Sequence, residues 1–430
     1  MIVARKTTLG RWLEVEFKPP FILVKSQKLS SVFDVLGQKR AVGFLGWAAL
    51  VSVPVIAATG MLLLLLSLHA LISRPEVQEA QREAGVQSLL LIPGLNPYLP
   101  ILYGWLGLVI ALIVHEGMHG VLARRLGYSV RSSGLILFTV IPIGAFVETD
   151  EEEMKTGKAR DVVRILAGGP ASNIAVALIS LSLLIFLTSS LQPATIITVE
   201  SVIDGSPAAE AGLRPGDVIT KINNTPVTSL STLYEAISAA GYNGEVIIEV
   251  SRGGGETSVY RVGVADLGAG RPMIGVRLMY ADIQEWASRH LQTYKSAYLR
   301  NPLIYLLPPS YPGSLHPFSE TQICTRPEGA ETECLSLSSL YIHPVMGGSG
   351  YQVTANALYW IWFVNFNVGI FNALPIYPLD GGQIFRRTIS SLLGKRLGEQ
   401  GVRAATLAIS LAVVGVVLSL FLIPYLSLLF

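Results

Sequence analysis

Residues 100–119 read PILYGWLGLVIALIVHEGMH, an apolar run that ends in His115-Glu116-Gly117-Met118-His119. In a helix, two His at i and i+4 point the same way and can share one Zn²⁺, and the Glu between them lies close enough to deprotonate a bound water. Ionisable groups in so apolar a segment are costly in hydrocarbon unless a buried partner such as a metal compensates them. The stretch therefore indicates a metalloprotease that works inside a bilayer.

The composition is that of a membrane protein. Only 14% of the residues are charged and 51% are hydrophobic, against roughly 25% charged in soluble globular chains. Charge-poor windows reach the roughly 20 residues that a spanning helix needs. We expect about five spans, at 43–71, 99–122, 165–189, 353–376 and 404–430. No basic and aromatic pattern suggests nucleic acid as a partner.

The distribution of Lys and Arg predicts the orientation of these spans. Residues 1–42 hold eight basic residues, whereas the loop 71–98 holds only Arg74 and Arg82. Basic residues accumulate in cytoplasmic loops. We therefore expect a cytoplasmic N-terminal segment over 1–42, and five alternating spans then place residues 190–352 and the C-terminus outside.

The apolar stretch LILFTVIPIGAFV, residues 135–147, is too short to span a membrane. Its β-branched residues and central Pro-Ile-Gly predict two strands and a turn. Such a hairpin either dips into the membrane beside the site or lies on the cytoplasmic surface. In the membrane, its backbone groups would need protein or a water-filled cavity around them. We assign it to a membrane region that covers residues 43–190.

Two polar residues stand out in the later spans. Asn173 follows Gly169-Pro170 near the start of the third span, where it either joins two helices by a hydrogen bond or serves the site. Asp380 lies in the Pro-broken segment 372–382, and broken helices at membrane depth line cavities. A catalytic zinc with two His needs a third protein ligand. Asp380 is the candidate, although Leu-Asp-Gly also fits an ordinary turn.

Together the motifs HEGMH (115–119), GPASN (169–173) and NALPIYPLDG (372–381) resemble the site-2 protease family of intramembrane zinc metalloproteases. The resemblance implies a three-helix catalytic core in which His115, His119 and Asp380 bind Zn²⁺ and Glu116 activates water. It also matches Asn173 and Asn372 to family positions linked to substrate or transition-state contacts. The sequence departs from the commonest pattern in having Ala373, not Pro, after Asn372, which puts the local helix geometry in doubt.

Residues 196–268 have a different, β-rich character. The segment SPAAEAGLRPGDVI (206–219) resembles a PDZ domain of the protease-associated kind. Turn residues and alternating polarity predict strands at 218–222 and 245–251 and a helix at 232–240. Such domains bind an extended chain end by strand addition. A peptide C-terminus is therefore an expected partner, while gating of substrates and simple packing against the core stay open.

An extracytoplasmic insertion rich in Pro, Ser and Gly follows at 281–352, with an amphipathic helix expected over 286–307. Cys324 and Cys334 are the chain's only cysteines, and outside the cell they could form a disulfide or stay reduced. His316 and His343 are expected to be surface residues and not ligands. The last membrane region, 353–430, carries the Leu-Asp-Gly motif and the C-terminal span.

The expected fold is thus a polytopic α-helical membrane protein with an inserted extracytoplasmic β-rich PDZ-like domain. The expected function is zinc-dependent hydrolysis of peptide bonds within or next to transmembrane helices of membrane-protein substrates, as in regulated intramembrane proteolysis. A catalytically inactive membrane scaffold and an ion-coupled transporter are the alternatives. A transporter could carry intramembrane His, Glu and Asp as a proton relay. It would not predict a PDZ-like domain.

Overall fold

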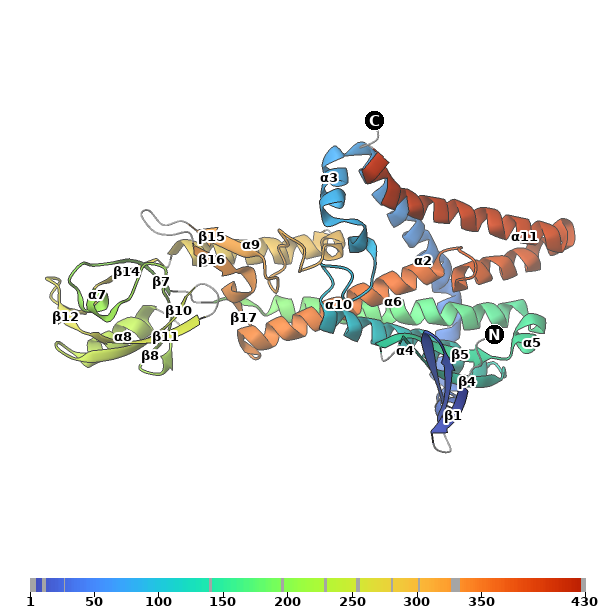
Figure 1. Ribbon diagram of the computed structural model, residues 1–430, viewed down its shortest axis with the longest axis horizontal. Coiled ribbons are helices and arrows are strands. Elements are labelled where there is room, and N and C mark those ends of the chain that lie inside the picture. The colour runs from blue at the N-terminus through green and yellow to red at the C-terminus, as the bar shows by residue number, and fades with distance from the viewer. Residues whose placement is uncertain are drawn as a thin grey trace. The chain divides into compact units, whose positions relative to one another are not determined.

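The computed structural model describes residues 5–426, apart from 10–12, 27, 139–140, 195–196, 228–229, 253–255, 280, 301 and 326–332. The chain forms two compact units (Figure 1). One comprises residues 1–182 and 357–430, and the other comprises residues 183–356.

Four helices are long and apolar enough to cross a membrane: α2 (Arg40–Ser73), α4 (Ile101–Arg125), α6 (Ala159–Ser189) and α11 (Asp380–Leu426). They cover four of the five expected spans. The remaining span, 353–376, lies in α10 (Gly347–Ala373), a 27-residue helix that is not among these four. The count of five therefore stays a prediction. Helix α11 has non-helical backbone at Gly398 (φ 64°), and Figure 1 shows it as two arms.

Small residues let the helices of the first unit approach closely. A Cβ added to Gly107 of α4 would lie 2.7 Å from the carbonyl oxygen of Trp360 in α10. Small residues at helix contacts are typical of membrane proteins, where lipid offers no hydrophobic drive for association. Helix α10 is thereby held against the helix that carries the His pair.

A five-stranded antiparallel sheet belongs to the same unit, in the order β1 (Arg5–Leu9), β2 (Leu13–Lys18), β3 (Phe21–Ser26), β4 (Val130–Phe138), β5 (Ile141–Thr149). The apolar stretch 135–147 lies within β4 and β5. Its Pro142-Ile143-Gly144 is part of β5 and not the turn, so the expected position of the turn was wrong. The two residues between the strands lie outside the described part. Strand β5 is at the edge of the sheet and packs along α4 (Figure 1).

Short elements complete the first unit: α1 (Lys28–Gly37), α3 (Pro75–Ala84), the 3-10 turn η1 (Val86–Leu89) and α5 (Glu151–Thr156). Helix α5 begins directly after β5. The Asp150 side chain caps it by accepting hydrogen bonds from the backbone N–H groups of Glu152 and Glu153. The cap fixes the chain at the point where the edge strand ends.

The second unit contains a six-stranded sheet in the order β11-β10-β8-β7-β14, with β9 beside β8. Its elements are β7 (Ile197–Val202), α7 (Pro207–Ala211), β8 (Val218–Ile222), β9 (Thr225–Pro226), α8 (Leu230–Ala240), β10 (Glu245–Arg252), β11 (Glu256–Gly263), β12 (Ala265–Asp266), β13 (Pro272–Met273) and β14 (Val276–Met279). The strands and helix expected at 218–222, 232–240 and 245–251 correspond to β8, α8 and β10. The sheet continues past the expected boundary at 268, because β14 pairs with β7.

The rest of this unit consists of β6 (Gln192–Pro193), α9 (Ala281–Arg300), η2 (Pro302–Leu306), β15 (Gln322–Thr325), β16 (Glu333–Ser336), η3 (Leu337–Leu340) and β17 (Tyr341–Ile342). The backbone register places Cys324 opposite Cys334 in the β15–β16 pair. The side chains of both cysteines lie outside the described part, so the disulfide stays a prediction.

Two histidines of this region are buried, and the expectation that they lie on the surface was wrong. His316 is 2% exposed and His343 is 6% exposed. The His316 Nε2–H donates to the carbonyl of Leu307 (2.8 Å), which leaves Nδ1 to accept from the Tyr294 hydroxyl (2.6 Å). Burial lowers the pKa of His316 from 6.5 to about 4.

Candidate active site

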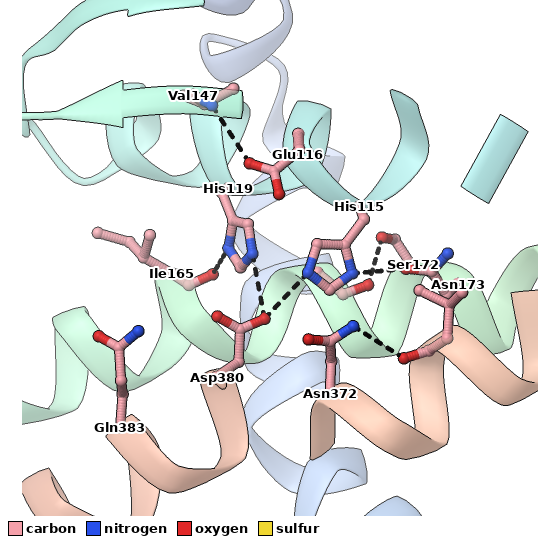
Figure 2. Close-up of polar contacts among 12 residues, drawn as sticks. His115, Glu116, His119, Val147, Ile165, Ser172, Asn173, Asn372, Asp380 and Gln383 are labelled. Atoms are coloured by element: carbon pink, nitrogen blue, oxygen red, sulfur yellow. Dashed lines mark hydrogen bonds and ion pairs between the residues drawn. The ribbon is translucent and has the colours of Figure 1, made fainter. Parts of the chain in front are cut away.

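Helix α4 and the first residue of α11 bring together three side chains that could bind a metal. The Nε2 atoms of His115 and His119 lie 3.0 Å and 3.3 Å from Oδ2 of Asp380 (Figure 2). Their three ligand atoms lie within 4.8 Å of one another. The residues that the sequence motifs singled out therefore meet at one point, although Asp380 follows the His pair by more than 260 positions.

The donor set fits a zinc ion. Ligand atoms at zinc distances on a tetrahedron lie about 3.3 Å apart, close to the two distances from Asp380. The Oδ2 atom of Asp380 is buried and receives no hydrogen bond from the described residues. A carboxylate oxygen and two imidazole nitrogens that converge in this way can hold a metal cation between them.

Gly169 of α6 leaves the space that this site occupies. A Cβ added to Gly169 would lie 2.5 Å from Nε2 of His119 and 2.7 Å from Nε2 of His115. Real Cβ atoms do not come so close to other heavy atoms. The GPASN motif therefore serves the site first through its glycine, whose missing side chain leaves the ligand faces of both rings open.

Both imidazole rings are oriented from behind by hydrogen bonds to α6. The Nδ1–H of His119 donates to the carbonyl oxygen of Ile165 (2.8 Å), and that of His115 donates to Oδ1 of Asn173 (2.7 Å). Because Nδ1 carries the hydrogen, Nε2 of each neutral ring keeps its lone pair for a metal. Figure 2 shows both Nε2 atoms directed at Asp380.

Asn173 itself is completely buried and fully engaged. Its Nδ2 donates to the carbonyl of Ala111 (3.1 Å) and to Oδ1 of Asn365 (3.0 Å). Asn365 was missed in the sequence. The only available signal was an amide side chain in the middle of an apolar helix, where polar residues commonly join helices.

A tight connection between α10 and α11 places Asp380. Helix α10 ends at Ala373 and α11 begins at Asp380. A Cβ on Gly381 would lie 2.1 Å from the carbonyl oxygen of Ala373, so only glycine fits where the chain folds back. Asp380 does stand at a helix start, as the turn interpretation supposed, yet its carboxylate lies against the His pair and is 9% exposed.

Glu116 lies beside the metal ligands and touches the sheet. Its Oε2 accepts a hydrogen bond from the backbone N–H of Val147 in β5, 3.2 Å away (Figure 2). Position 147 is at the outer edge of the five-stranded sheet. The side chain expected to activate water is therefore in direct contact with an edge strand.

A cavity of about 1310 Å³ opens onto the site. His115, Glu116, His119, Asn372 and Asp380 line its inner end. Residues of β5, α5, α6 and both arms of α11 also line it, with the side chains of Lys155, Arg386, Arg387, Lys395 and Arg403 among them. The Nδ2 of Asn372 donates to the carbonyl of Val368 (3.0 Å), which holds this amide at the cavity wall.

Comparison with known families identifies the chain. The sequence model of Peptidase family M50 matches residues 103–417, about three quarters of this chain, and the match includes His115, His119 and Asp380. The chain belongs to Peptidase family M50. The resemblance to site-2 proteases is thereby confirmed, and the M50 protein is a metallopeptidase.

Individual relatives of this M50 peptidase cover different parts of it. An uncharacterised protein of Methanocaldococcus jannaschii is 34% identical over 36% of this chain, which spans 40% of that protein's length. A protein of Clostridium perfringens, named provisionally as a zinc metalloprotease, is 22% identical over 71% of this chain and 92% of its own. Zinc metalloprotease Rip1 of Mycobacterium tuberculosis is 27% identical over 35% of this chain and 48% of its own.

Among solved structures, the PDZ domain of an SdrC-like protein from Listeria monocytogenes matches 19% of this chain and 86% of its own length. The sequence identity is 27% and the TM-score is 0.18.

Proposed function

We propose that the protein is a zinc metalloendopeptidase that hydrolyses peptide bonds within or next to transmembrane helices of membrane-protein substrates, as in regulated intramembrane proteolysis. One observation carries the proposal. The His115, His119 and Asp380 donors converge in a buried site formed by helices α4 and α11, both long and apolar enough to span a membrane. A site at that depth suits a substrate that is itself in the bilayer.

The residues present have roles that fit this chemistry. Bound zinc would supply a Lewis acid and a lower pKa for water. Glu116, half-buried at the cavity, takes the proton of the attacking water and returns it to the leaving amine. One amide hydrogen of Asn372 is bonded to Val368, and the second can donate to the carbonyl oxygen of the scissile bond.

The edge strand β5 offers a way to hold the substrate. A transmembrane helix bonds its own carbonyls and must unwind locally before cleavage. The N–H of Val147 points away from β4 toward Glu116, and the N–H of Ala145, two residues earlier, faces the same way. An unwound substrate segment can add to this edge as a further strand. Its peptide bond would then lie next to Glu116.

The basic lining of the cavity supports an opening toward the cytoplasm. Arg386, Arg387 and Lys395 line it, and basic residues accumulate on the cytoplasmic side of membrane proteins. With the eight basic residues of positions 1–42, this favours a cytoplasmic N-terminus and an inserted domain on the opposite side. Water reaches the catalytic residues from the cytoplasm in this arrangement.

The inserted domain contains a second binding site in this proposal. A groove of about 350 Å³ lies between α8 and residues 271–278, with Leu233 and Ile237 among its apolar lining. Strand β14, at the edge of the sheet, forms one side. The charged residues that line the groove are Arg271 and Arg277. An extended peptide C-terminus, added as a strand to β14, suits this surface, and acidic side chains would complement its charge.

Zinc dependence of cleavage tests the proposal. The full chain, purified in detergent, is stripped with a chelator and assayed on a model transmembrane segment before and after zinc is restored. We expect cleavage to be lost without zinc and regained with one zinc per chain. Cleavage by the stripped protein at the original rate would contradict the proposal.

A further inference from the structure

A continuous set of hydrogen bonds connects α10 to the metal ligand His115. The Nδ2 of Asn365 donates to the carbonyl of Ile361 (2.8 Å), and its Oδ1 accepts from Nδ2 of Asn173 (3.0 Å). The Oδ1 of Asn173 then accepts from Nδ1 of His115 (2.7 Å). Asn173 and Asn365 are both 0% exposed. Both amide side chains are therefore shielded from solvent.

The direction of every bond in this set is fixed. A backbone carbonyl can only accept, so Ile361 forces Nδ2 of Asn365 toward it and turns Oδ1 of Asn365 toward Asn173. Asn173 must then present its Nδ2 to Asn365 and to Ala111, and its Oδ1 to His115. His115 is thereby held with hydrogen on Nδ1 and a lone pair on Nε2.

We propose that Asn365 is a positioning residue that acts through Asn173 to keep His115 in the tautomer that binds the metal. The inference rests on the proposed zinc site and gives Asn173 a role in holding a ligand, in place of the substrate contact that the family resemblance implied. Without Asn365, the amide of Asn173 loses one of its two acceptors, and the carbonyl of Ala111 alone opposes a flip. A flipped amide would present N–H groups to Nδ1 and favour hydrogen on Nε2, the nitrogen that faces Asp380.

The zinc affinity of the full chain tests this role without any measurement of cleavage. Competition with a chromophoric chelator gives the dissociation constant for zinc alone. We expect Asn365→Leu, which keeps the branched shape and removes both bonds, to weaken zinc binding about 10-fold, the lower end for residues that support metal ligands. Asn365→Ser should do the same and serves if the Leu variant fails to fold. The absorption spectrum of bound Co²⁺ should also change.

Asn367→Leu is the matched control. Asn367 lies on the same helix, and its Nδ2 bonds to the carbonyl of Phe363 within that helix (2.8 Å). The zinc affinity of the Asn367→Leu variant should equal that of the wild type. A general loosening of α10 would weaken zinc binding in both Leu variants, and that result would overturn the proposal.

A double-mutant cycle separates action through Asn173 from an independent effect. Asn173→Ala should weaken zinc binding by itself, and adding Asn365→Leu should then change nothing further. A second, independent loss in the double variant, or an Asn365→Leu affinity within twofold of the wild type, would overturn the inference. Failure of the wild type to bind zinc would instead refute the proposed function.

Discussion

The backbone N–H of Val147 donates to Oε2 of Glu116 across 3.2 Å, so the edge of the five-stranded sheet touches the residue expected to activate water. Strand β5 follows the His pair by more than 20 residues and returns along α4 to reach it. The catalytic helix and the surface on which a substrate strand can add are therefore parts of one site.

Ala145→Pro tests whether a substrate adds to β5. Proline removes the outward N–H at position 145 and leaves the pairing with β4, because proline is tolerated at sheet edges. We expect cleavage of a model transmembrane segment to fall about 10-fold, the effect of losing one or two hydrogen bonds. Zinc content should be unchanged. Ala145→Val keeps the N–H and is the control. Equal cleavage by both variants would argue against strand addition.

Gly169→Ala should disturb the metal site directly. The added methyl group would lie 2.5 Å from Nε2 of His119, so the rings must move apart from their ligand positions. We expect zinc affinity to fall at least about 10-fold, measured by chelator competition. Gly168→Ala is the neighbouring control, since its Cβ would meet Leu122 and Met118 and not the histidines. The Gly168→Ala variant should be less stable than the wild type, but its zinc affinity should be unchanged. Equal zinc affinity in the two variants would count against the fit of Gly169 to the site.

Arg271→Glu should reverse the charge preference of the groove in the inserted domain. Titration of the full chain with a fluorescent peptide that ends in acidic residues should show about 10-fold weaker binding than the wild type, and salt should weaken the wild-type binding. Arg214→Glu is the control, because this exposed arginine lies on the same domain and outside the groove. Identical affinities in the two variants would rule out recognition by Arg271.

The second unit should lose stability in acid because of His316. Its pKa falls from 6.5 to about 4 on burial, so the unfolded chain binds the proton more tightly than the folded one. The stabilisation is complete above pH 6.5 and is lost as pH falls toward 4. At pH 4.5 the loss is about 2 to 3 kcal/mol. Thermal unfolding at pH 7 and pH 4.5 should show a smaller drop in His316→Gln than in the wild type. The same drop in both would contradict this assignment.

Local sequence patterns singled out three residues that the structure brings together, but they did not reveal the residues that support them. His115 and His119 are one helical turn apart, and Asp380 is the acid of the last broken segment, so local patterns singled out all three. Asn365 lies in no such pattern, because its partner Asn173 is nearly 200 residues away. The order of strands in the five-stranded sheet could not be predicted from local patterns either. Pairing of Leu23 with Ile136 joins segments more than 100 residues apart, and nothing local marks it.

The burial of polar side chains also could not be predicted from local sequence patterns. His316 lies in a Pro-rich segment that resembles a surface loop. Its burial depends on Tyr294 and on the carbonyl of Leu307, which satisfy both ring nitrogens. Such partners become visible only once the chain is folded.

Glu116→Gln tests the central claim most directly, because it removes the base and keeps the size and the contact with Val147. The full chain and this variant are compared for zinc content and for cleavage of a model transmembrane segment, with Asp380→Asn as the ligand control. We expect Glu116→Gln to keep one zinc per chain and lose cleavage by at least about 100-fold, and Asp380→Asn to lose zinc. Cleavage at the wild-type rate by zinc-loaded Glu116→Gln would contradict the account.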